Sequence, residues 1–467
     1  MQGTLSVSAI LVALIVAAYA GSLTGAFQFD DWNVIVGDPR VQSLQAWWQS
    51  MPGIRPLLKL SYALNFELDS RFSLGPAGFR SANILLHAGN TVLVYQVLSN
   101  FAVSILGGER SRIAIVALTG AVVFALHPVQ TEAVTYISGR SNALMALPAL
   151  IAVFAWQRSA ISDHKQAWQW LSALSVLLTC AIKETAVVVP LALWLAYVCG
   201  ANRAASRPPA PWPQTSVLLL AVGLIGLSPV YRSLLAHSLQ VRGSIDNLLL
   251  VQPDAILYLA GQLLRFDRLN ADPMMTPQLL WAPDAVLSLA LIVLALVVAM
   301  VALRRRPWLA FGLLWFFVWL APTNSLLARN DLVNDRQLYL AIMGPAWLLG
   351  VGLARLQQIF GSVRLRLALG ALCIVMGVAT MVRNRVYADE IVFWQDVTAK
   401  SVGNPRAHNN LGIALAHRCR DAEAREQFKR ALRIDPDYFL ASGNLAMLEQ
   451  GGLADPQQPC AAAASVR

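Results

Sequence analysis

Long apolar runs separated by short polar loops dominate this chain, and each run approaches the roughly 20 residues that a helix needs to cross a bilayer. The pattern therefore predicts an all-α fold, a polytopic membrane bundle of about eleven transmembrane helices over residues 1–383. The expected spans lie near 5–27, 81–106, 112–127, 141–157, 166–182, 185–200, 213–232, 283–303, 308–322, 337–354 and 364–382. A long first loop is expected at residues 28–80, between the first two spans.

Basic residues of the loops fall on one side of the predicted membrane: Arg110 with Arg112, Arg158 with Lys165, Arg203 with Arg207, Arg304 with Arg305 and Arg306, and Arg355 with Arg364 and Arg366. By the positive-inside rule that side is cytoplasmic. Residues 252–266 are apolar enough to span, but a span there would put the later basic loops outside. We therefore interpret 252–266 as a re-entrant or interfacial helix, which leaves the N-terminus inside and the C-terminal domain outside.

After about residue 383 the chain becomes polar and predicts a helical domain over 384–450, followed by a disordered tail at 451–467. Residues 405–438 fit the 34-residue tetratricopeptide pattern, with Phe428 in the second helix and Pro436 at the end. Two interpretations stay open for this domain. It either caps the membrane part or offers a groove to a protein or peptide partner.

Composition agrees with the pattern and narrows the function. The chain is 57% hydrophobic and 13% charged, with a mean hydropathy of +0.54, which excludes an ordinary soluble domain. The net charge of +10 is spread over short loops and forms no basic stripe, so nucleic acid is not the expected partner. The five cysteines give no metal-binding spacing and no disulfide framework, and no Walker loop, Rossmann glycine pattern or nucleophile elbow occurs.

The first candidate catalytic residues are Asp30 and Asp31, directly after the first apolar run. A helix cap explains one aspartate there but not an adjacent pair. A carboxylate at a membrane surface can act as a general base or as a ligand of a divalent cation such as Mg²⁺ or Mn²⁺. We expect these two residues to be catalytic.

Further polar residues are expected on the same outer face, each with a structural alternative. The candidates for binding the sugar or a metal are His127, Glu132, Glu184, Asn324 and Tyr339. The cationic candidates for a lipid phosphate are Arg55, Arg140, Lys183 and Arg336, with Lys59, Arg80 and Arg329 nearby in the same loops. A histidine at a helix end is often structural, Lys183 and Glu184 could simply pair, and Arg55 could anchor the loop at the interface.

Arg336 is the strongest phosphate candidate among these cations. It stands at the start of an apolar run, and a guanidinium holds phosphate oxygens bidentately better than an ammonium does. The alternatives are a salt bridge to Asp335 or a membrane anchor. Asp331 lies in the same loop.

Taken together, these motifs resemble the transmembrane and tetratricopeptide-containing O-mannosyltransferases of the glycosyltransferase C superfamily. The resemblance rests on Asp30-Asp31-Trp32-Asn33, residues 127–134 with Gly139-Arg140, Lys183-Glu184, and residues 321–324 through 335–340, and it covers nearly the whole chain in order. It implies a multispan enzyme that takes a sugar from a polyprenyl phosphate. Asp30 would be the catalytic base, with Asp31 beside it, and Arg336 would meet the lipid phosphate. Animal members carry many repeats, whereas this chain carries about two or three.

The compact, arginine-rich chain is typical of a bacterial protein, so with the loop-charge orientation we expect a protein of the inner membrane whose active site faces the periplasm. The expected reaction moves a mannose-like sugar, with either inversion or retention at the anomeric carbon, to Ser or Thr of an exported protein. One alternative is transfer to an envelope glycan or lipid. Another is a membrane scaffold or transporter without enzymatic activity, but transport predicts ionisable residues in mid-span, whereas here they gather at one face.

Overall fold

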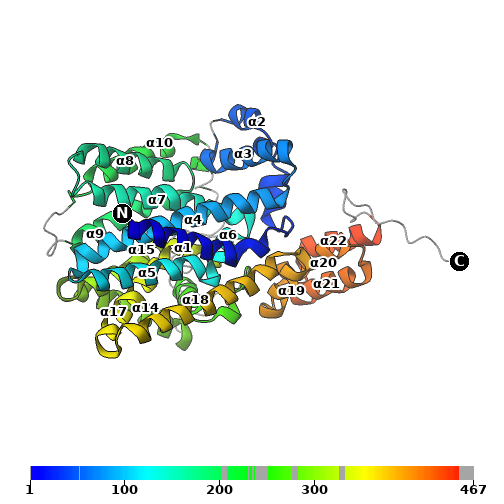
Figure 1. The fold of residues 1–467 in the computed structure, drawn as a ribbon. Helices are drawn as coiled ribbons and strands as arrows, with labels where there is room; N and C mark the ends of the chain where they lie inside the picture. The colour runs from blue at the N-terminus through cyan, green and yellow to red at the C-terminus, as the bar shows by residue number, and fades with distance from the viewer. Residues whose placement is uncertain are drawn as a thin grey trace.

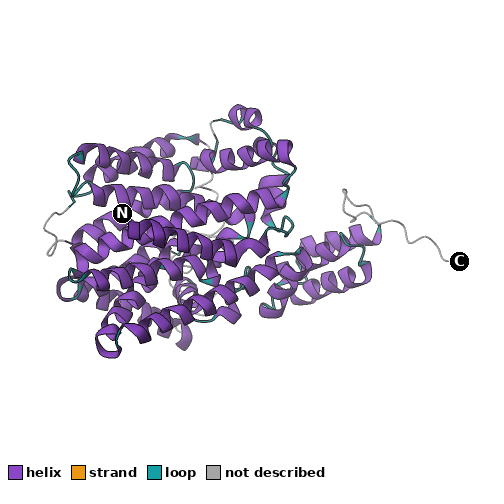
Figure 2. Cartoon of the chain, viewed as in Figure 1, coloured by secondary structure: helices purple, strands orange, loops and turns teal. Residues whose placement is uncertain are grey.

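The computed structural model describes residues 2–51, 53–200, 208–229, 231–233, 236, 251–275, 282–324 and 332–451. Among them the chain forms helices joined by loops, and none of these residues lies in a β-strand (Figure 2). The expected all-α fold is confirmed. Arg329, Asp331 and the tail at 452–467, about which the sequence made predictions, lie outside the described residues.

The α-helices of the part expected in the membrane are α1 Gln2–Tyr19, α2 Leu44–Gln49, α3 Pro56–Phe72, α4 Pro76–Phe101, α5 Arg110–Leu126, α6 Thr131–Val134, α7 Arg140–Arg158, α8 Lys165–Cys180, α9 Val189–Gly200, α10 Trp212–Leu227, α13 Gln252–Gln262, α14 Pro283–Arg305, α15 Pro307–Leu320, α16 Leu338–Ala341, α17 Met343–Phe360 and α18 Ser362–Asn384. Several of them begin with proline, whose missing N–H costs nothing in the first helical turn. The helices stack as a bundle (Figure 1), with α4 packed against α1, α5 and α7.

Five helical segments of the described part are long and apolar enough to cross a membrane: Leu5–Ser22, Pro76–Leu106, Ile137–Arg158, Pro283–Arg305 and Ser362–Val386. Two bent pairs raise the number to seven, and three apolar helices are shorter: Glu184–Gly200, Trp212–Leu227 and Pro307–Leu320. Each predicted span contains a helix, but the number of about eleven is not confirmed. A helix of 16 residues such as α10 is only about 24 Å long, less than the roughly 30 Å hydrocarbon core.

The two bent pairs each join a short helical arm to a longer helix. Arg110–Leu126 and Pro128–Val134 meet at 49°, because Pro128 has no N–H with which to continue α5. Asp335–Ala341 and Met343–Phe360 meet at 53°. Both bends put a short helical segment with charged residues beside the first loop. The segment around 252–266 forms α13, which is 11 residues long and is not one of the candidate spans.

The C-terminal unit contains α19 Glu390–Lys400, α20 Pro405–Ala416, α21 Asp421–Ile434 and α22 Phe439–Glu449. It projects from one end of the bundle, and α18 leads into it through the short helix Arg385–Tyr387 (Figure 1). Helices α20 and α21 pack as a hairpin. A Cβ atom at Gly412 would lie 2.6 Å from the ring of Phe428, so this hairpin needs a glycine at the contact.

The C-terminal unit also contacts the loop that follows α1. The Gln28 side chain donates a hydrogen bond to the Tyr387 carbonyl at 2.7 Å, and the Ala26 N–H donates to the Ala388 carbonyl at 3.3 Å. The Phe29 ring packs edge-on against Trp394, with 5.1 Å between ring centroids. These contacts fix the backbone immediately before Asp30.

Candidate active site

The two adjacent aspartates of the first loop lie in different surroundings. Asp31 is fully buried, and its carboxylate accepts hydrogen bonds from the Gln28 N–H at 3.1 Å, from the Ser138 N–H at 2.8 Å and from the Ser138 hydroxyl. Burial raises the pKa of Asp31 to about 6, against the opposing effect of these hydrogen bonds. Asp30 is partly exposed and faces a cavity. Asp31 therefore ties the loop to the segment before α7, and Asp30 is the carboxylate that a substrate can reach.

The cavity at Asp30 has a volume of about 430 Å³ and opens to the surface. Its lining residues are Asp30, Asn33, Val34, Asp38, Arg40, Ile54, Arg55, Leu58, Lys59, Tyr62, Ser138, Ser141, Lys183 and Arg336. Four of the predicted site residues, Asp30, Arg55, Lys183 and Arg336, thus come together from distant parts of the chain. The cavity is lined by more cationic than acidic side chains, which favours an anionic ligand.

Each cation of the cavity is held in place by a neighbour. Arg55 forms a bidentate pair with Glu184, at 2.7 Å for the closest contact, so Glu184 contacts Arg55 in this structure. The Lys183 ammonium donates to Asn142 Oδ1 at 2.6 Å and to the Ser141 hydroxyl at 3.3 Å. These contacts hold both head groups at the cavity wall, so a ligand meets cations that are already ordered.

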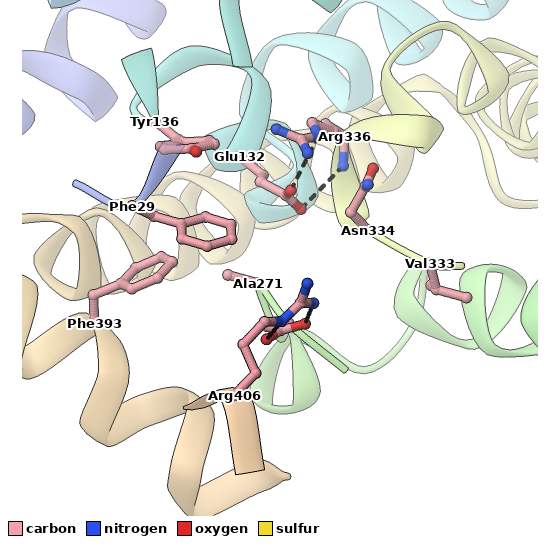
Figure 3. Close-up of a pocket in the computed structure, with 10 residues that line it drawn as sticks. Phe29, Glu132, Tyr136, Ala271, Val333, Asn334, Arg336, Phe393 and Arg406 are labelled. Carbon is pink, nitrogen blue, oxygen red and sulfur yellow. Dashed lines mark hydrogen bonds and ion pairs between the residues drawn. The ribbon is translucent and has the colours of Figure 1, made fainter. Parts of the chain in front are cut away.

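Arg336 is positioned by Glu132, which comes from the other bent pair of helices. Glu132 is buried; its Oε1 lies 3.5 Å from Arg336 Nε, and its Oε2 accepts the Arg336 backbone N–H at 3.1 Å. The Arg336 guanidinium also lies over the Tyr136 ring, 5.7 Å from its centroid. Figure 3 shows Arg336 and Glu132 in contact at one side of a small recess that Phe29 and Phe393 also line.

That recess lies where the C-terminal unit meets the membrane part. Arg406 of α20 enters it from the side opposite Arg336 (Figure 3) and pairs with Asp272. The recess has a volume of only about 10 Å³, so it holds little more than a water molecule. Arg336 lines this recess as well as the Asp30 cavity.

Two predicted site residues are buried and bonded to protein groups away from the cavity. Arg140 donates to Asn83 Oδ1 at 2.7 Å and to two backbone carbonyls, and it lies 4.8 Å from the centroid of Tyr62. His127 accepts the Val129 N–H at its Nδ1, and its Nε2 lies 3.1 Å from the Leu263 carbonyl oxygen. Neither lines the Asp30 cavity. Arg80 is likewise buried among the carbonyls of Gly25, Ala26 and Thr135.

Asn324 and Tyr339 are not among the described residues that line the Asp30 cavity. The Asn324 amide donates to Gln252 Oε1 at 3.2 Å and links the end of α15 to α13. The Tyr339 hydroxyl accepts from the Asn90 amide at 3.0 Å and lies 2.9 Å from His87 Nδ1. Both contacts stabilise the bundle next to the site.

An apolar groove of about 610 Å³ lies next to the Arg55–Glu184 pair. Its lining residues are Cys180, Glu184, Thr185, Val187, Val188, Val222, Ile225, Tyr231, Ala321 and Pro322. The groove therefore puts hydrocarbon-lined space beside the cations of the Asp30 cavity.

A metal held by protein ligands alone does not fit the described residues. They contain no group of three or more His, Cys, Asp or Glu side chains close enough to bind one ion. In the cavity, Asp38 is already paired with Arg40 at 2.7 Å and lies 3.7 Å from the Lys59 ammonium.

Sequence reasoning missed Ser138, Tyr136 and Tyr62. Ser138 holds Asp31, the Tyr136 hydroxyl accepts the Asp30 N–H at 3.0 Å, and Tyr62 lines the cavity. The sequence feature that could have pointed to these three residues was Gly139. An added Cβ at Gly139 would collide with the Glu132 carbonyl oxygen. A glycine at such a close approach marks the compact turn that carries Glu132, Tyr136 and Ser138.

Comparison with known proteins finds one repeat family and several relatives. The tetratricopeptide repeat family matches residues 405–438. The protein named protein O-mannosyl-transferase F38B6.6 of Caenorhabditis elegans is 22% identical over 456 residues, which cover 92% of this chain. The chain is similar to proteins named protein O-mannosyl-transferases. The expected resemblance to tetratricopeptide-containing O-mannosyltransferases is confirmed.

Two other relatives align over a shorter region. Human protein O-mannosyl-transferase TMTC4 is 31% identical over 199 residues, and mouse protein O-mannosyl-transferase TMTC1 is 31% identical over 209 residues. These alignments cover 37% and 39% of this chain. The chain spans 63% of the length of the nematode relative, 27% of the human one and 21% of the mouse one.

Proposed function

We propose that this protein is an integral membrane glycosyltransferase that moves a mannose-like sugar from a polyprenyl phosphate to a hydroxyl group. The observation that carries the proposal is the position of Asp30 in one cavity with Arg55, Lys183 and Arg336, beside an apolar groove. A carboxylate, a set of cations and a hydrocarbon-lined groove match the three parts of the reaction: an acceptor hydroxyl, a phosphate and a lipid tail.

In the proposed reaction the acceptor hydroxyl oxygen attacks the anomeric carbon of the sugar and gives its proton to the Asp30 carboxylate. The bond between the anomeric carbon and the phosphate oxygen breaks, and its electron pair leaves with the polyprenyl phosphate. Arg336 and Lys183 stabilise the negative charge that grows on this leaving group. A single displacement of this kind inverts the anomeric carbon.

The glycosyltransferase C architecture and the periplasmic placement of the site are parts of the same proposal. Loop charge supports the placement, because the basic loops gather on the side opposite Asp30. This supports an extracytoplasmic C-terminal unit in a protein of the inner membrane.

The acceptor in this proposal is Ser or Thr of an exported protein, as the names of the relatives suggest by analogy. The repeat unit would contact that protein, since tetratricopeptide hairpins commonly bind peptides. Transfer to an envelope glycan or lipid is the alternative, and a scaffold without enzymatic activity is the second one.

Mass spectrometry of exported proteins from cells with and without this chain tests the proposal. We expect hexose-modified Ser or Thr peptides that disappear with the chain and do not return with its Asp30→Asn variant. An altered envelope glycan or lipid with unmodified proteins would favour the first alternative. Unchanged glycosylation in all fractions, together with no transfer by the purified protein, would favour the scaffold.

A further inference from the structure

Residues 269–274 run between the membrane part and the C-terminal unit without forming a helix or a strand. This bridging segment follows the short helix Phe266–Arg268. Asp272 precedes Pro273, and a residue before proline favours an extended backbone. Leu269 packs in the core of the bundle, whereas Ala271 packs against the hydrophobic cluster around Trp394 in the C-terminal unit. The segment therefore joins the two hydrophobic cores.

The turn between α19 and α20 holds the main chain of the bridging segment. The Lys400 ammonium donates a hydrogen bond to the Leu269 carbonyl at 2.7 Å. The Ser401 hydroxyl donates to the Asp272 carbonyl at 3.3 Å, and the Asn404 amide donates to the same oxygen at 3.2 Å. Bonds to main-chain carbonyls bind an extended peptide without reading its side chains.

One carboxylate adds sequence specificity to this contact. Asp272 is 5% exposed, and its Oδ2 accepts from the Asn404 amide at 3.1 Å and from Arg406 Nε at 2.9 Å. Arg406 Nη2 donates to the other carboxylate oxygen, so the ion pair is bidentate. Asn404 also caps α20, because its Oδ1 accepts the Ala407 N–H at 3.2 Å. The cap therefore orients the Asn404 amide nitrogen toward Asp272.

Asp267 gives a comparison within the same loop. Its side chain is 79% exposed and lies 3.8 Å from Arg268, which is itself exposed. Asp272 instead has lost its water and is surrounded by donors of the repeat unit. Because a buried carboxylate is costly unless it is paired and hydrogen-bonded, these donors form a selective site for it.

We propose that the turn between α19 and α20 is a peptide-binding site whose ligand is the bridging segment of the same chain. Its preferred ligand is an extended peptide with an aspartate that meets Asn404 and Arg406. Ala271, Asp272 and Arg406 line the recess that Arg336 also lines, so the bound segment forms one wall of that recess (Figure 3). Contact of the repeat unit with an acceptor protein then uses other faces. This inference does not depend on the proposed function.

Binding of a synthetic peptide of residues 267–275 to the full-length protein in lipid nanodiscs tests the proposal. In the wild type the tethered segment has an effective concentration of roughly millimolar or higher, so it excludes the free peptide. Asp272→Lys places a cation beside Arg406 and releases the tethered segment. We expect this variant to bind the peptide at least about tenfold more tightly than the wild type does, measured by fluorescence anisotropy.

Asp267 supplies the matched controls. A peptide with Asp267→Asn should bind the Asp272→Lys protein as well as the parent peptide does, because this side chain lies in solvent. A peptide with Asp272→Asn should bind about tenfold more weakly, because hydrogen bonds between charged groups are lost. The protein variant Asp267→Lys should exclude the peptide as the wild type does, since its own segment stays bound.

A charge exchange tests the same contact without a free peptide, in case Asp272→Lys does not fold. Asp272→Arg and Arg406→Asp should each speed hydrogen exchange of the amides of residues 269–274. The double variant restores opposite charges, so we expect exchange about tenfold slower than in either single variant. Asp267→Arg combined with Arg406→Asp is the control and should show no recovery.

Tighter peptide binding by Asp272→Lys, or recovery of protection in the charge exchange, supports the site, and the absence of both overturns it. A peptide that binds the wild type and Asp272→Lys alike overturns occupation of the site by the chain's own segment. These measurements need no sugar transfer. A protein that transfers no sugar but shows these effects would keep the site and lose the proposed function, and the converse result would lose the site alone.

Discussion

Glu132 holds Arg336 at two points, one on the backbone N–H at 3.1 Å and one on the guanidinium at 3.5 Å. The two residues are 204 positions apart, and each lies on the short arm of a bent helix pair. Arg336 in turn lines both the Asp30 cavity and the recess at the C-terminal unit. Its position therefore decides the geometry of the whole candidate site.

Arg336→Ala should weaken use of the lipid donor by about 2–5 kcal/mol, because a buried phosphate loses its charged partner. Arg336→Lys should restore only part of this, since an ammonium cannot reproduce the bidentate fork. Glu132→Gln keeps an acceptor for the Arg336 N–H and should raise the KM for the donor less than Arg336→Ala does. Steady-state kinetics with a defined donor measure all three, and full activity of Arg336→Ala would remove Arg336 from the site.

Asp30→Asn should preserve the fold and reduce turnover by about 10²–10⁴-fold, the usual contribution of a general base. Asp31→Asn should instead lower stability, because its carboxylate accepts three hydrogen bonds from Gln28 and Ser138. Turnover and thermal unfolding of both purified variants, with and without a chelator, distinguish the roles. If Asp30→Asn stays active while Asp31→Asn is stable but inactive, Asp31 is the general base and Asp30 has the structural role.

The free energy of unfolding should change with pH because Asp31 has different pKa values in the folded and unfolded states. Its pKa is raised from 3.8 to about 6 by burial, so between these values the folded state keeps a proton that the unfolded state has released. The free energy of unfolding should therefore fall as the pH rises through this window, by on the order of 2–3 kcal/mol. Unfolding of the wild type and of Asp31→Asn from pH 3.5 to 7 measures the difference, and parallel curves would contradict it.

The orientation of the chain is tested by a reporter fused after Glu449. Loop charge puts this end outside, so a reporter that works only after export should be active. A second fusion after Arg306, next to three consecutive arginines, is the control and should give a cytoplasmic signal. A cytoplasmic signal after Glu449 would make residues 252–266 a true span.

Trp394→Ala should destabilise the protein by about 3–5 kcal/mol, as expected for loss of a fully buried large aromatic residue. It should also reduce turnover, since Trp394 packs on Phe29 next to Asp30. Phe439→Ala is the control, because Phe439 is 75% exposed on α22 and should change neither quantity. Normal turnover of a folded Trp394→Ala protein would mean that the Asp30 loop keeps its position without this contact.

The sequence predicted the helical class, the repeat and the segments that meet at the cavity. Apolar runs and rare charged motifs can be recognised from the order of residues alone. It did not predict the different surroundings of Asp30 and Asp31. That difference comes from Ser138, 107 residues away, whose hydroxyl carries no signal of its own. A carboxylate pair in a sequence therefore indicates a site without saying which member a substrate can reach.

Arg140 and His127 illustrate a second limit. Both residues were expected on the outer face of the membrane part. In the structure both side chains are buried and contact backbone carbonyl oxygens. A buried polar side chain must find partners wherever the fold supplies them, and those partners are set by packing rather than by spacing. The number of about eleven spans is not confirmed, since the length of a helix in the structure depends on breaks that hydropathy does not record.

Ala26 and Gln28 donate hydrogen bonds to the carbonyls of Ala388 and Tyr387, which lie just before the repeat helices. These bonds limit where the repeats of one relative can be joined to the membrane part of another. A chimera joined at the end of α18 would replace the residues that brace the loop carrying Asp30. A chimera joined after Arg406 would keep these residues and the ion pair with Asp272, and would change only the outer helices. Longer arrays are thus compatible with the same membrane unit, provided that recombination spares the chain up to Arg406.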